Sequence, residues 1–105
     1  MTRIVITGAC GKMGRVINDI VNTRDDCEIT AGIDIAGEQY ADFPVYKKLF
    51  DLPEKPDVII DFSHPSLLDE LLDYCKINNV PVVIATTGYT DEQIKQIKTA
   101  AGQIP

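Results

Sequence analysis

Three short, continuous runs of β-branched residues constrain the fold of this chain more than any other feature: Ile4–Ile6, Val58–Ile60 and Val82–Ile84. Runs that do not alternate with polar residues are typical of parallel strands buried on both faces. A weaker fourth candidate extends from Glu28 to Ile33 and is interrupted by Gly32. The sequence therefore predicts a parallel sheet that must be covered on both sides.

Helical patterns alternate with these runs. Apolar residues recur at helical spacing from Met13 to Val21 and from Leu67 to Cys75. A third pattern follows Thr90–Gln93, whose residue types predict a capping box. The stretch 35–57 is irregular, with a short edge strand expected within Phe43–Tyr46 and a helical turn within Lys48–Leu52. The order β-α-β-(irregular)-β-α-β-α predicts one α/β domain over residues 1–105, a Rossmann-like, doubly wound parallel sheet.

Composition excludes several other classes of protein. The 105 residues suffice for one domain, and 45% apolar with 25% charged residues is ordinary for a globular protein. A net charge of −6 argues against nucleic acid or an anionic membrane as partner. No apolar run reaches the roughly 18–20 residues of a membrane span, and no signal peptide is evident. Three cysteines without C-x-x-C spacing and one histidine favour a reduced, cytoplasmic protein with neither disulfides nor metal.

Ligands of open parallel sheets bind outside the carboxyl ends of the strands. The residues that follow the four predicted strands are small, polar or glycine-bearing, and the topology brings them to one edge: Thr7-Gly8-Ala9-Cys10-Gly11-Lys12-Met13-Gly14, Asp34, Asp61-Phe62-Ser63-His64 and Ala85-Thr86-Thr87-Gly88-Tyr89. This edge is the expected binding site.

The first of these segments is a G-x-x-G-x-x-G loop between a strand and a helix, which is suited to holding a pyrophosphate at the helix N-terminus. Asp34 lies twenty positions beyond Gly14, where a carboxylate can accept hydrogen bonds from a ribose. A cation at the start of a helix is unfavourable unless an anion lies nearby. We therefore expect Lys12 to contact phosphate, whereas Arg15 is equally compatible with a solvated charge.

Two other nucleotide-binding motifs are excluded by residue identity. A P-loop requires Ser or Thr after its Gly-Lys pair, and Met13 follows Gly11-Lys12 here. None of the four tyrosines has the lysine four residues later that short-chain dehydrogenases would usually show.

Three segments together, Ile6–Gly14, Asp57–Pro65 and Ala85–Tyr89, resemble the dihydrodipicolinate reductases of lysine and diaminopimelate biosynthesis. The resemblance covers essentially the whole chain but corresponds only to that family's N-terminal dinucleotide-binding domain. It implies an NAD(P)H-dependent oxidoreductase that transfers hydride to 4-hydroxy-tetrahydrodipicolinate or its dehydrated form.

The resemblance also implies which residues bind the cofactor. The pyrophosphate would lie on Gly8, Ala9, Cys10, Gly11, Lys12 and Met13, the adenosine ribose on Asp34, the middle of the cofactor on Phe62 and Ser63, and the nicotinamide side on Ala85, Thr86, Thr87 and Gly88. His64 falls where family members often carry arginine, so its role is left open.

The family's C-terminal domain, which is associated with catalysis and tetramerisation, is absent from this sequence. Its histidine pair and lysine are associated with proton donation and substrate binding, so we expect this chain to bind cofactor without turnover and to be monomeric or weakly associated. Two alternatives are a free-standing nucleotide-binding or sensing module and a flavodoxin-like domain that binds proteins.

Asp34 would repel the 2′-phosphate of NADPH, and Ile35 follows where arginine would help to accept it. NADH is therefore the favoured cofactor, and NADPH is not excluded because Lys12 softens the penalty. Asp61 is interpreted as an anchor for the loop after its strand, with a general base as the alternative. Cys10 and Tyr89 are interpreted as packing residues.

Overall fold

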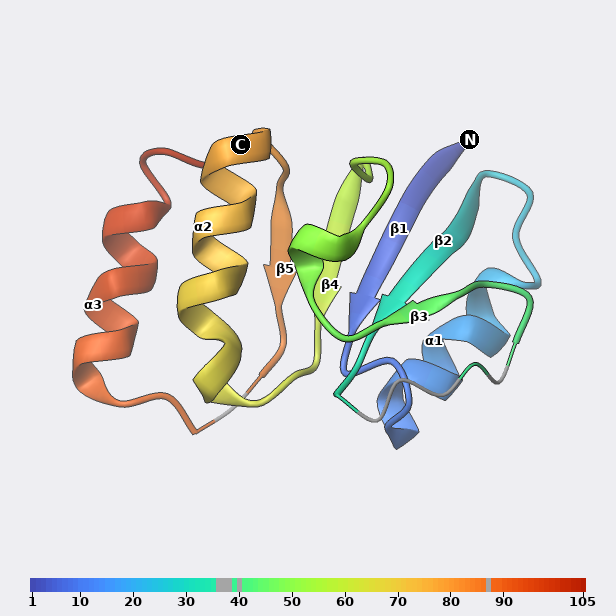
Figure 1. Cartoon of the computed structure of the whole chain (residues 1–105), viewed down its shortest axis with the longest axis horizontal. Coiled ribbons are helices and arrows are strands. Elements are labelled where there is room, and N and C mark those ends of the chain that lie inside the picture. The colour runs from blue at the N-terminus through green and yellow to red at the C-terminus, as the bar shows by residue number, and fades with distance from the viewer. Residues whose placement is uncertain (36–38, 40, 87) are drawn as a thin grey trace.

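The computed structural model describes residues 1–35, 39, 41–86 and 88–105, and it contains one five-stranded sheet in which all strand pairs are parallel. The strand order is β3-β2-β1-β4-β5 (Figure 1). The strands are β1 (Thr2–Thr7), β2 (Cys27–Ile33), β3 (Val45–Tyr46), β4 (Val58–Asp61) and β5 (Val82–Ile84). The predicted Rossmann-like α/β domain is confirmed, and β3 is the expected edge strand.

The described chain has three α-helices and two short 3-10 helices. They are α1 (Lys12–Val21), α2 (Leu68–Asn78), α3 (Asp91–Ala100), η1 (Leu49–Asp51) and η2 (Pro65–Leu67). Figure 1 shows α2 and α3 side by side near β5, and α1 at the other side of the molecule near β2 and β3. All three predicted helices and the helical turn before β4 are therefore present.

Alternation along the strands divides the core into two layers. Val5 and Ile59 pack on one face of the sheet with Leu71 of α2, and all three side chains are buried. Ile4 packs on the other face with Val21 of α1. Both faces of the central strands are thus covered, which explains why their sequences are continuous apolar runs.

The apolar stripe of α1 is less buried than its periodicity predicts. Met13, Val16 and Ile20 are 46%, 39% and 51% exposed, whereas Val21 is buried. On the same face of the sheet Val83 of β5 is 57% exposed. Among the described residues α1 is the only helix packed against this face, so it covers part of the face and leaves one flank of its own stripe uncovered.

The ends of the helices differ in a way that matters for binding. Thr90 caps α3 by accepting the Gln93 N–H at 3.2 Å, and the Gln93 side chain accepts the Thr90 N–H at 3.0 Å. This is the predicted capping box. By contrast, α1 begins after Gly11, which has no side chain to cap it. No helix among the described residues is long and apolar enough to cross a membrane.

Candidate functional site

The order of the sheet reverses between β1 and β4, and the loops that follow these two strands touch each other. Gly8 has a φ of +67°, and a Cβ atom placed on it would lie 2.6 Å from the carbonyl oxygen of Phe62. Only glycine fits this position without strain. Ligands of doubly wound sheets bind at such a switch point, so the geometry places the glycine loop where a ligand is expected.

The start of α1 is arranged to accept an anion. A Cβ atom on Gly14 would lie 2.3 Å from the carbonyl oxygen of Ala9, so glycine lets the first turn of the helix pack directly on the loop. The first turn of α1 contains no acidic residue, whereas α3 has Asp91 and Glu92 in its first turn. The uncapped N–H groups and positive dipole end of α1 are therefore not compensated by an acid in its first turn.

Two adjoining hollows run along this edge of the molecule. The first, about 430 Å³, includes Asp34, and the second, about 370 Å³, includes Ala85 and Thr86. Both are lined by a shared set from the glycine loop and the β4 loop: Gly8, Gly11, Phe62, Ser63 and His64. Together they form one extended crevice, whose two ends are formed by the segments after β2 and after β5.

At the first end of the crevice the Asp34 carboxylate is held against the glycine loop. Its Oδ2 accepts the backbone N–H of Cys10 at 3.0 Å. Lys47 also lines this hollow, whereas Lys12 lines the second hollow. Lys47 thus shares the hollow of Asp34, and it is a cation that the sequence did not single out. Lys47 directly follows β3, and only the placement of this short edge strand could have indicated it.

Asp61 anchors the loops beneath the second hollow. It is fully buried, and its carboxylate accepts hydrogen bonds from the hydroxyls of Thr7, Ser63, Thr86 and Tyr89, four residues from three strand ends. This dense set of donors supports the interpretation of Asp61 as an anchor. Tyr89 packs against a cluster formed by α2 and α3, and burial together with the Asp61 charge raises the pKa of its hydroxyl.

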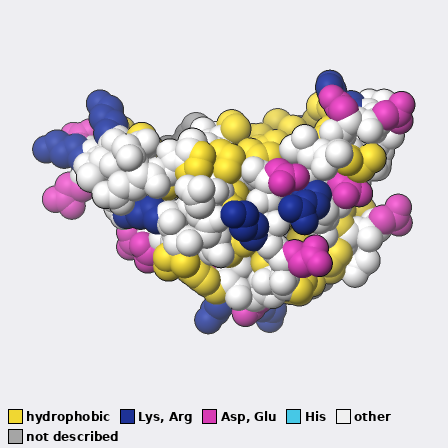
Figure 2. Space-filling view, turned by 90° about the horizontal axis from the view of Figure 1, so that it is seen from above, with side chains coloured by type: hydrophobic (Ala, Val, Ile, Leu, Met, Phe, Trp, Pro, Cys, Tyr) yellow, Lys and Arg dark blue, Asp and Glu magenta, His cyan; other side chains and the backbone are white. Residues whose placement is uncertain are grey.

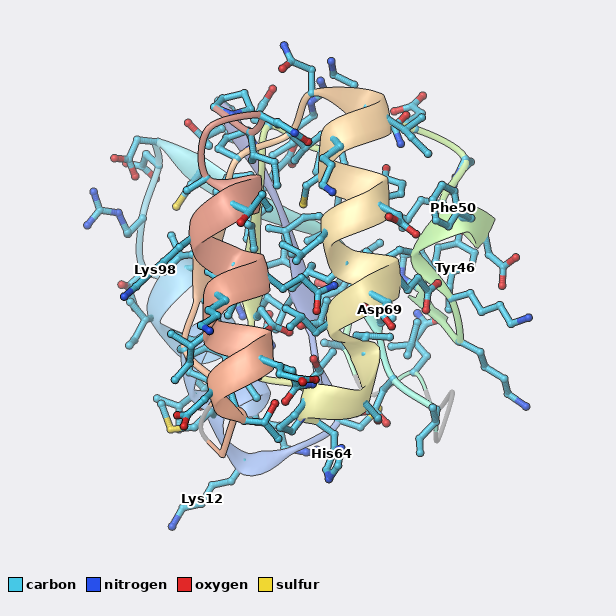
Figure 3. The ribbon with its side chains drawn as sticks, turned by 90° about the vertical axis from the view of Figure 1, so that its left-hand side faces the viewer. Lys12, Tyr46, Phe50, His64, Asp69 and Lys98 are labelled. Atoms are coloured by element: carbon cyan, nitrogen blue, oxygen red, sulfur yellow. The ribbon has the colours of Figure 1, made fainter. Side chains whose placement is uncertain are left out.

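His64 lines both hollows and caps the short helix η2. Its Nδ1 accepts the backbone N–H of Ser66 at 3.1 Å. In the neutral ring with this hydrogen bond the proton is on Nε2. Figure 3 shows His64 and Lys12 at the same end of the molecule, with Lys12 pointing away from the body of the protein.

Of the other predicted site residues that the structure describes, Met13 lines the crevice, whereas Ala9, Cys10 and Gly88 do not. Ala9 is fully buried and its N–H donates to the Ile33 carbonyl at 3.2 Å. Met13 lines the second hollow with Lys12. Arg15 turns back to the loop, where its Nε donates to the Cys10 carbonyl at 3.3 Å. Gly88 is exposed, with a φ of +86°. The prediction for Thr87 lies outside the described residues.

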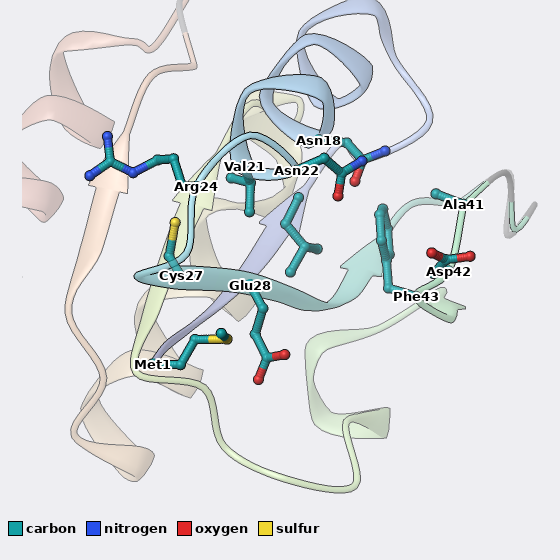
Figure 4. Close-up of a pocket in the computed structure, with 11 residues that line it drawn as sticks. Met1, Asn18, Val21, Asn22, Arg24, Cys27, Glu28, Ala41, Asp42 and Phe43 are labelled. Carbon is teal, nitrogen blue, oxygen red and sulfur yellow. The ribbon is translucent and has the colours of Figure 1, made fainter.

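A larger hollow, about 500 Å³, lies away from this edge, between the end of α1, the start of β2 and residues 41–43 (Figure 4). None of the strand-end loops described above contributes to it. Figure 2 shows the end of the molecule opposite the crevice, where basic and acidic side chains are interspersed among apolar ones. No group of three metal-ligating side chains occurs in the described part of the chain.

A doubly wound parallel sheet with a glycine loop and a crevice at its switch point defines the class of Rossmann-like dinucleotide-binding domains. A family model described as the N-terminus of dihydrodipicolinate reductase matches residues 2–105. The chain belongs to this family, as the resemblance in its sequence indicated.

Known relatives agree with this assignment. The chain is 39% identical to the 4-hydroxy-tetrahydrodipicolinate reductases of Clostridium novyi and Clostridium tetani over 105 residues, all of this chain but 42% and 41% of those proteins. It therefore spans about two fifths of the length of these relatives.

Solved structures show the same fold. A dipicolinate-bound dihydrodipicolinate reductase from Paenisporosarcina matches with a TM-score of 0.79 and 34% identity, over 96% of this chain and 43% of that one. A conserved hypothetical protein from Pyrococcus furiosus matches with a TM-score of 0.72 at 14% identity, over 96% of this chain and 89% of that one. The second match concerns the fold alone.

Proposed function

We propose that this chain is the cofactor-binding part of an NAD(P)H-dependent reductase that acts on 4-hydroxy-tetrahydrodipicolinate in lysine and diaminopimelate biosynthesis. The observation that carries the proposal is the extended crevice, which has Asp34 at one end, the uncapped start of α1 at its middle and Thr86 at the other end. Membership of the family supports the same cofactor class.

The residues of the crevice fit a dinucleotide. Asp34 would accept hydrogen bonds from the adenosine ribose, and the amides at the start of α1 would donate to the pyrophosphate, with Lys12 adding a positive charge. Ala85 and Thr86 would hold the nicotinamide end. The bound nicotinamide supplies the hydride; the chain's own residues bind and orient the cofactor.

NADH is the proposed preferred cofactor. The Asp34 carboxylate is held in place by Cys10 and would repel a 2′-phosphate. Lys47 lies on the same hollow, where its positive charge would reduce this repulsion without removing it. NADPH should therefore bind, but more weakly than NADH.

The direct test is a calorimetric titration of the chain with NADH and, in parallel, with NADPH. Saturable binding is expected, and Lys12→Ala should weaken it by about three- to tenfold, because a phosphate contact is lost. Lys98→Ala is the matched control, since Lys98 is an exposed lysine on α3, and it should leave the affinity unchanged. Asp34→Ala should reduce the ratio of NADH to NADPH affinity. Absence of saturable binding to the folded chain would contradict the proposal.

Turnover is proposed to require residues outside these 105, because the matched relatives are more than twice as long. The chain mixed with NADH and 4-hydroxy-tetrahydrodipicolinate should bind cofactor without oxidising it. Oxidation of NADH by the purified chain at a rate above the buffer blank would contradict this part of the proposal. The full-length family is expected to be cytoplasmic and tetrameric, and this chain to be monomeric or weakly associated in gel filtration.

A further inference from the structure

Asp61 is surrounded by hydrogen-bond donors, two of which, Ser63 and Thr86, line the second hollow. Its Oδ1 accepts the hydroxyls of Thr7 and Ser63, the latter at 2.5 Å. Its Oδ2 accepts the hydroxyl of Thr86 at 2.8 Å and that of Tyr89 at 3.3 Å. The Ser63 N–H adds a fifth donor at 3.3 Å, so both oxygens of the buried carboxylate accept hydrogen bonds from neighbouring residues.

This arrangement fixes the direction of every hydroxyl. An aspartate carboxylate can only accept hydrogen bonds, and a serine or threonine hydroxyl has one hydrogen and two lone pairs. A hydroxyl that gives its hydrogen to Asp61 therefore presents only lone pairs to any other partner. Thr86 also lies 3.4 Å from the Asp61 backbone carbonyl, which again accepts, so its hydrogen points to Asp61 in either case.

Of the four residues that donate these hydroxyls, Ser63 and Thr86 line the second hollow, and Thr7 and Tyr89 do not. Thr7 is fully buried, and the ring of Tyr89 packs in the cluster between α2 and α3. Ser63 and Thr86 are half-buried and line the second hollow. Ser63 lines both hollows and Thr86 lines the second, so their oxygens are the acceptors on this part of the crevice, where Lys12 and His64 are also present.

We propose that Asp61 is a positioning residue that keeps the hydroxyls of Ser63 and Thr86 as acceptors, so that this end of the crevice selects a hydrogen-bond donor such as the carboxamide NH2 of nicotinamide and rejects a carboxylate in its place. The inference rests on the proposed function, because it assumes that a dinucleotide binds along the crevice. It adds a specificity that depends on a buried side chain out of reach of the ligand.

Two dinucleotides that differ only in this group test the inference. NAD+ carries a carboxamide, and nicotinic acid adenine dinucleotide carries a carboxylate at the same position. Calorimetric titration of the chain should give about tenfold weaker binding for the acid, because one hydrogen bond is lost and the carboxylate faces lone pairs. The ratio of the two dissociation constants is the readout, since it is measured on folded protein and is insensitive to a loss of stability.

Asp61→Asn should bring this ratio towards one. The amide of asparagine donates hydrogen bonds, so a hydroxyl that faces it accepts, and its own hydrogen becomes available to the crevice or, for Thr86, to the backbone carbonyl of residue 61. Asp57→Asn is the matched control, because Asp57 is the exposed aspartate just before the opposite end of β4, where it pairs with Arg3. It should leave the ratio unchanged. Thermal unfolding of each variant confirms that the titrations are made on folded chain.

Thr86 supplies a second, independent variant. Thr86→Val removes the acceptor and should reduce the preference for the carboxamide, whereas Thr86→Ser retains the hydroxyl and should keep it. In the double variant Asp61→Asn/Thr86→Val, the effects of the two substitutions on the ratio should add only in part, since Thr86→Val removes one of the two hydroxyls through which Asp61 acts.

Equal binding of the two dinucleotides by the unaltered chain would overturn the inference and leave the proposed function standing. A preference for the carboxamide that persists in folded Asp61→Asn or Thr86→Val would also overturn it. Failure of the folded chain to bind either dinucleotide would overturn the proposed function and this inference with it. A preference that is lost in Asp61→Asn and Thr86→Val but kept in Thr86→Ser and Asp57→Asn is the result that supports it.

Discussion

At the scale of single residues, Gly8 has the most restrictive environment in the crevice. Its positive φ excludes most side chains, and the Phe62 carbonyl occupies the space where a Cβ atom would lie. These two constraints are independent, and both follow from the contact between the loops after β1 and β4. Gly8 thus lets the two loops touch and also lines both hollows.

Gly8→Ala should therefore destabilise the chain by about 2 to 5 kcal/mol, the sum of left-handed backbone strain and overpacking. Gly102→Ala is the matched control, because a Cβ atom there would meet its nearest atom at 3.7 Å. Its effect should stay within about 0.5 kcal/mol. Urea unfolding measures both. Equal stabilities for the two variants would show that the loops do not touch as described.

Cys75 is another residue whose surroundings fix its chemistry. It is fully buried on α2, and burial together with the nearby Asp61 charge raises the pKa of its thiol from 9.0 to about 12. The folded state thus holds the thiol proton more tightly than the unfolded state does. The associated stability is complete below pH 9 and is lost as the pH rises towards 12.

The midpoint of thermal unfolding should accordingly fall as the pH is raised above about 9. Burial also raises the pKa values of Tyr74 and Tyr89, which extends the decline to higher pH. Cys75→Ala should lower stability at neutral pH by leaving a cavity, and should make the alkaline decline shallower. The slope between pH 9 and 11, measured for both proteins, is the test. Identical slopes would be inconsistent with a buried, protonated thiol.

At the scale of elements, the three helices differ in how they begin. The capping box of α3 satisfies two of its own N–H groups, whereas the glycine at the start of α1 leaves that end without a side-chain cap. In a capped helix the first backbone N–H groups already have acceptors within the protein. An uncapped helix with no acid in its first turn leaves these groups available to an anionic ligand.

Thr90→Ala should cost about 1 kcal/mol of stability, because it removes the side-chain acceptor for the Gln93 N–H. Thr99→Ala makes the same substitution at an exposed position inside α3, where alanine is the better helix former, and should cost nothing. Chemical unfolding of the two variants measures the loss of stability in each. A loss of similar size in both would mean that the cap contributes no stability.

The elements themselves could largely be predicted from the sequence, since β-branched runs, helical periodicity and capping residues are local signals. The burial of each side chain could not be predicted in the same way, because it depends on which residues pack against that side chain in the folded protein. The stripe of α1 indicated a helix correctly, yet Met13, Val16 and Ile20 are exposed, since burying them requires a partner that periodicity alone does not specify. Lys47 was missed for a related reason: its two-residue strand is too short to place its neighbour at the ligand edge.

At the scale of the whole molecule, the crevice exists only because distant segments converge. Gly8 follows β1, Asp34 follows β2, Ser63 follows β4 and Thr86 follows β5, and the parallel sheet brings all four to one edge. The rule that ligands bind at the carboxyl ends of parallel strands predicted this convergence. It could not predict the buried hydrogen bonds of Asp61, because these depend on side-chain positions that the topology leaves open.

Nuclear magnetic resonance distinguishes binding of a dinucleotide along this edge from binding in the larger hollow at the end of α1. Backbone amide signals of the labelled chain would be followed during titration with NADH. We expect saturable shifts at Gly8, Gly11, Ser63 and Ala85, with the amide of Asn22 in the larger hollow unchanged. Shifts confined to the larger hollow, or no shifts at saturating NADH, would show that the crevice is not the dinucleotide site.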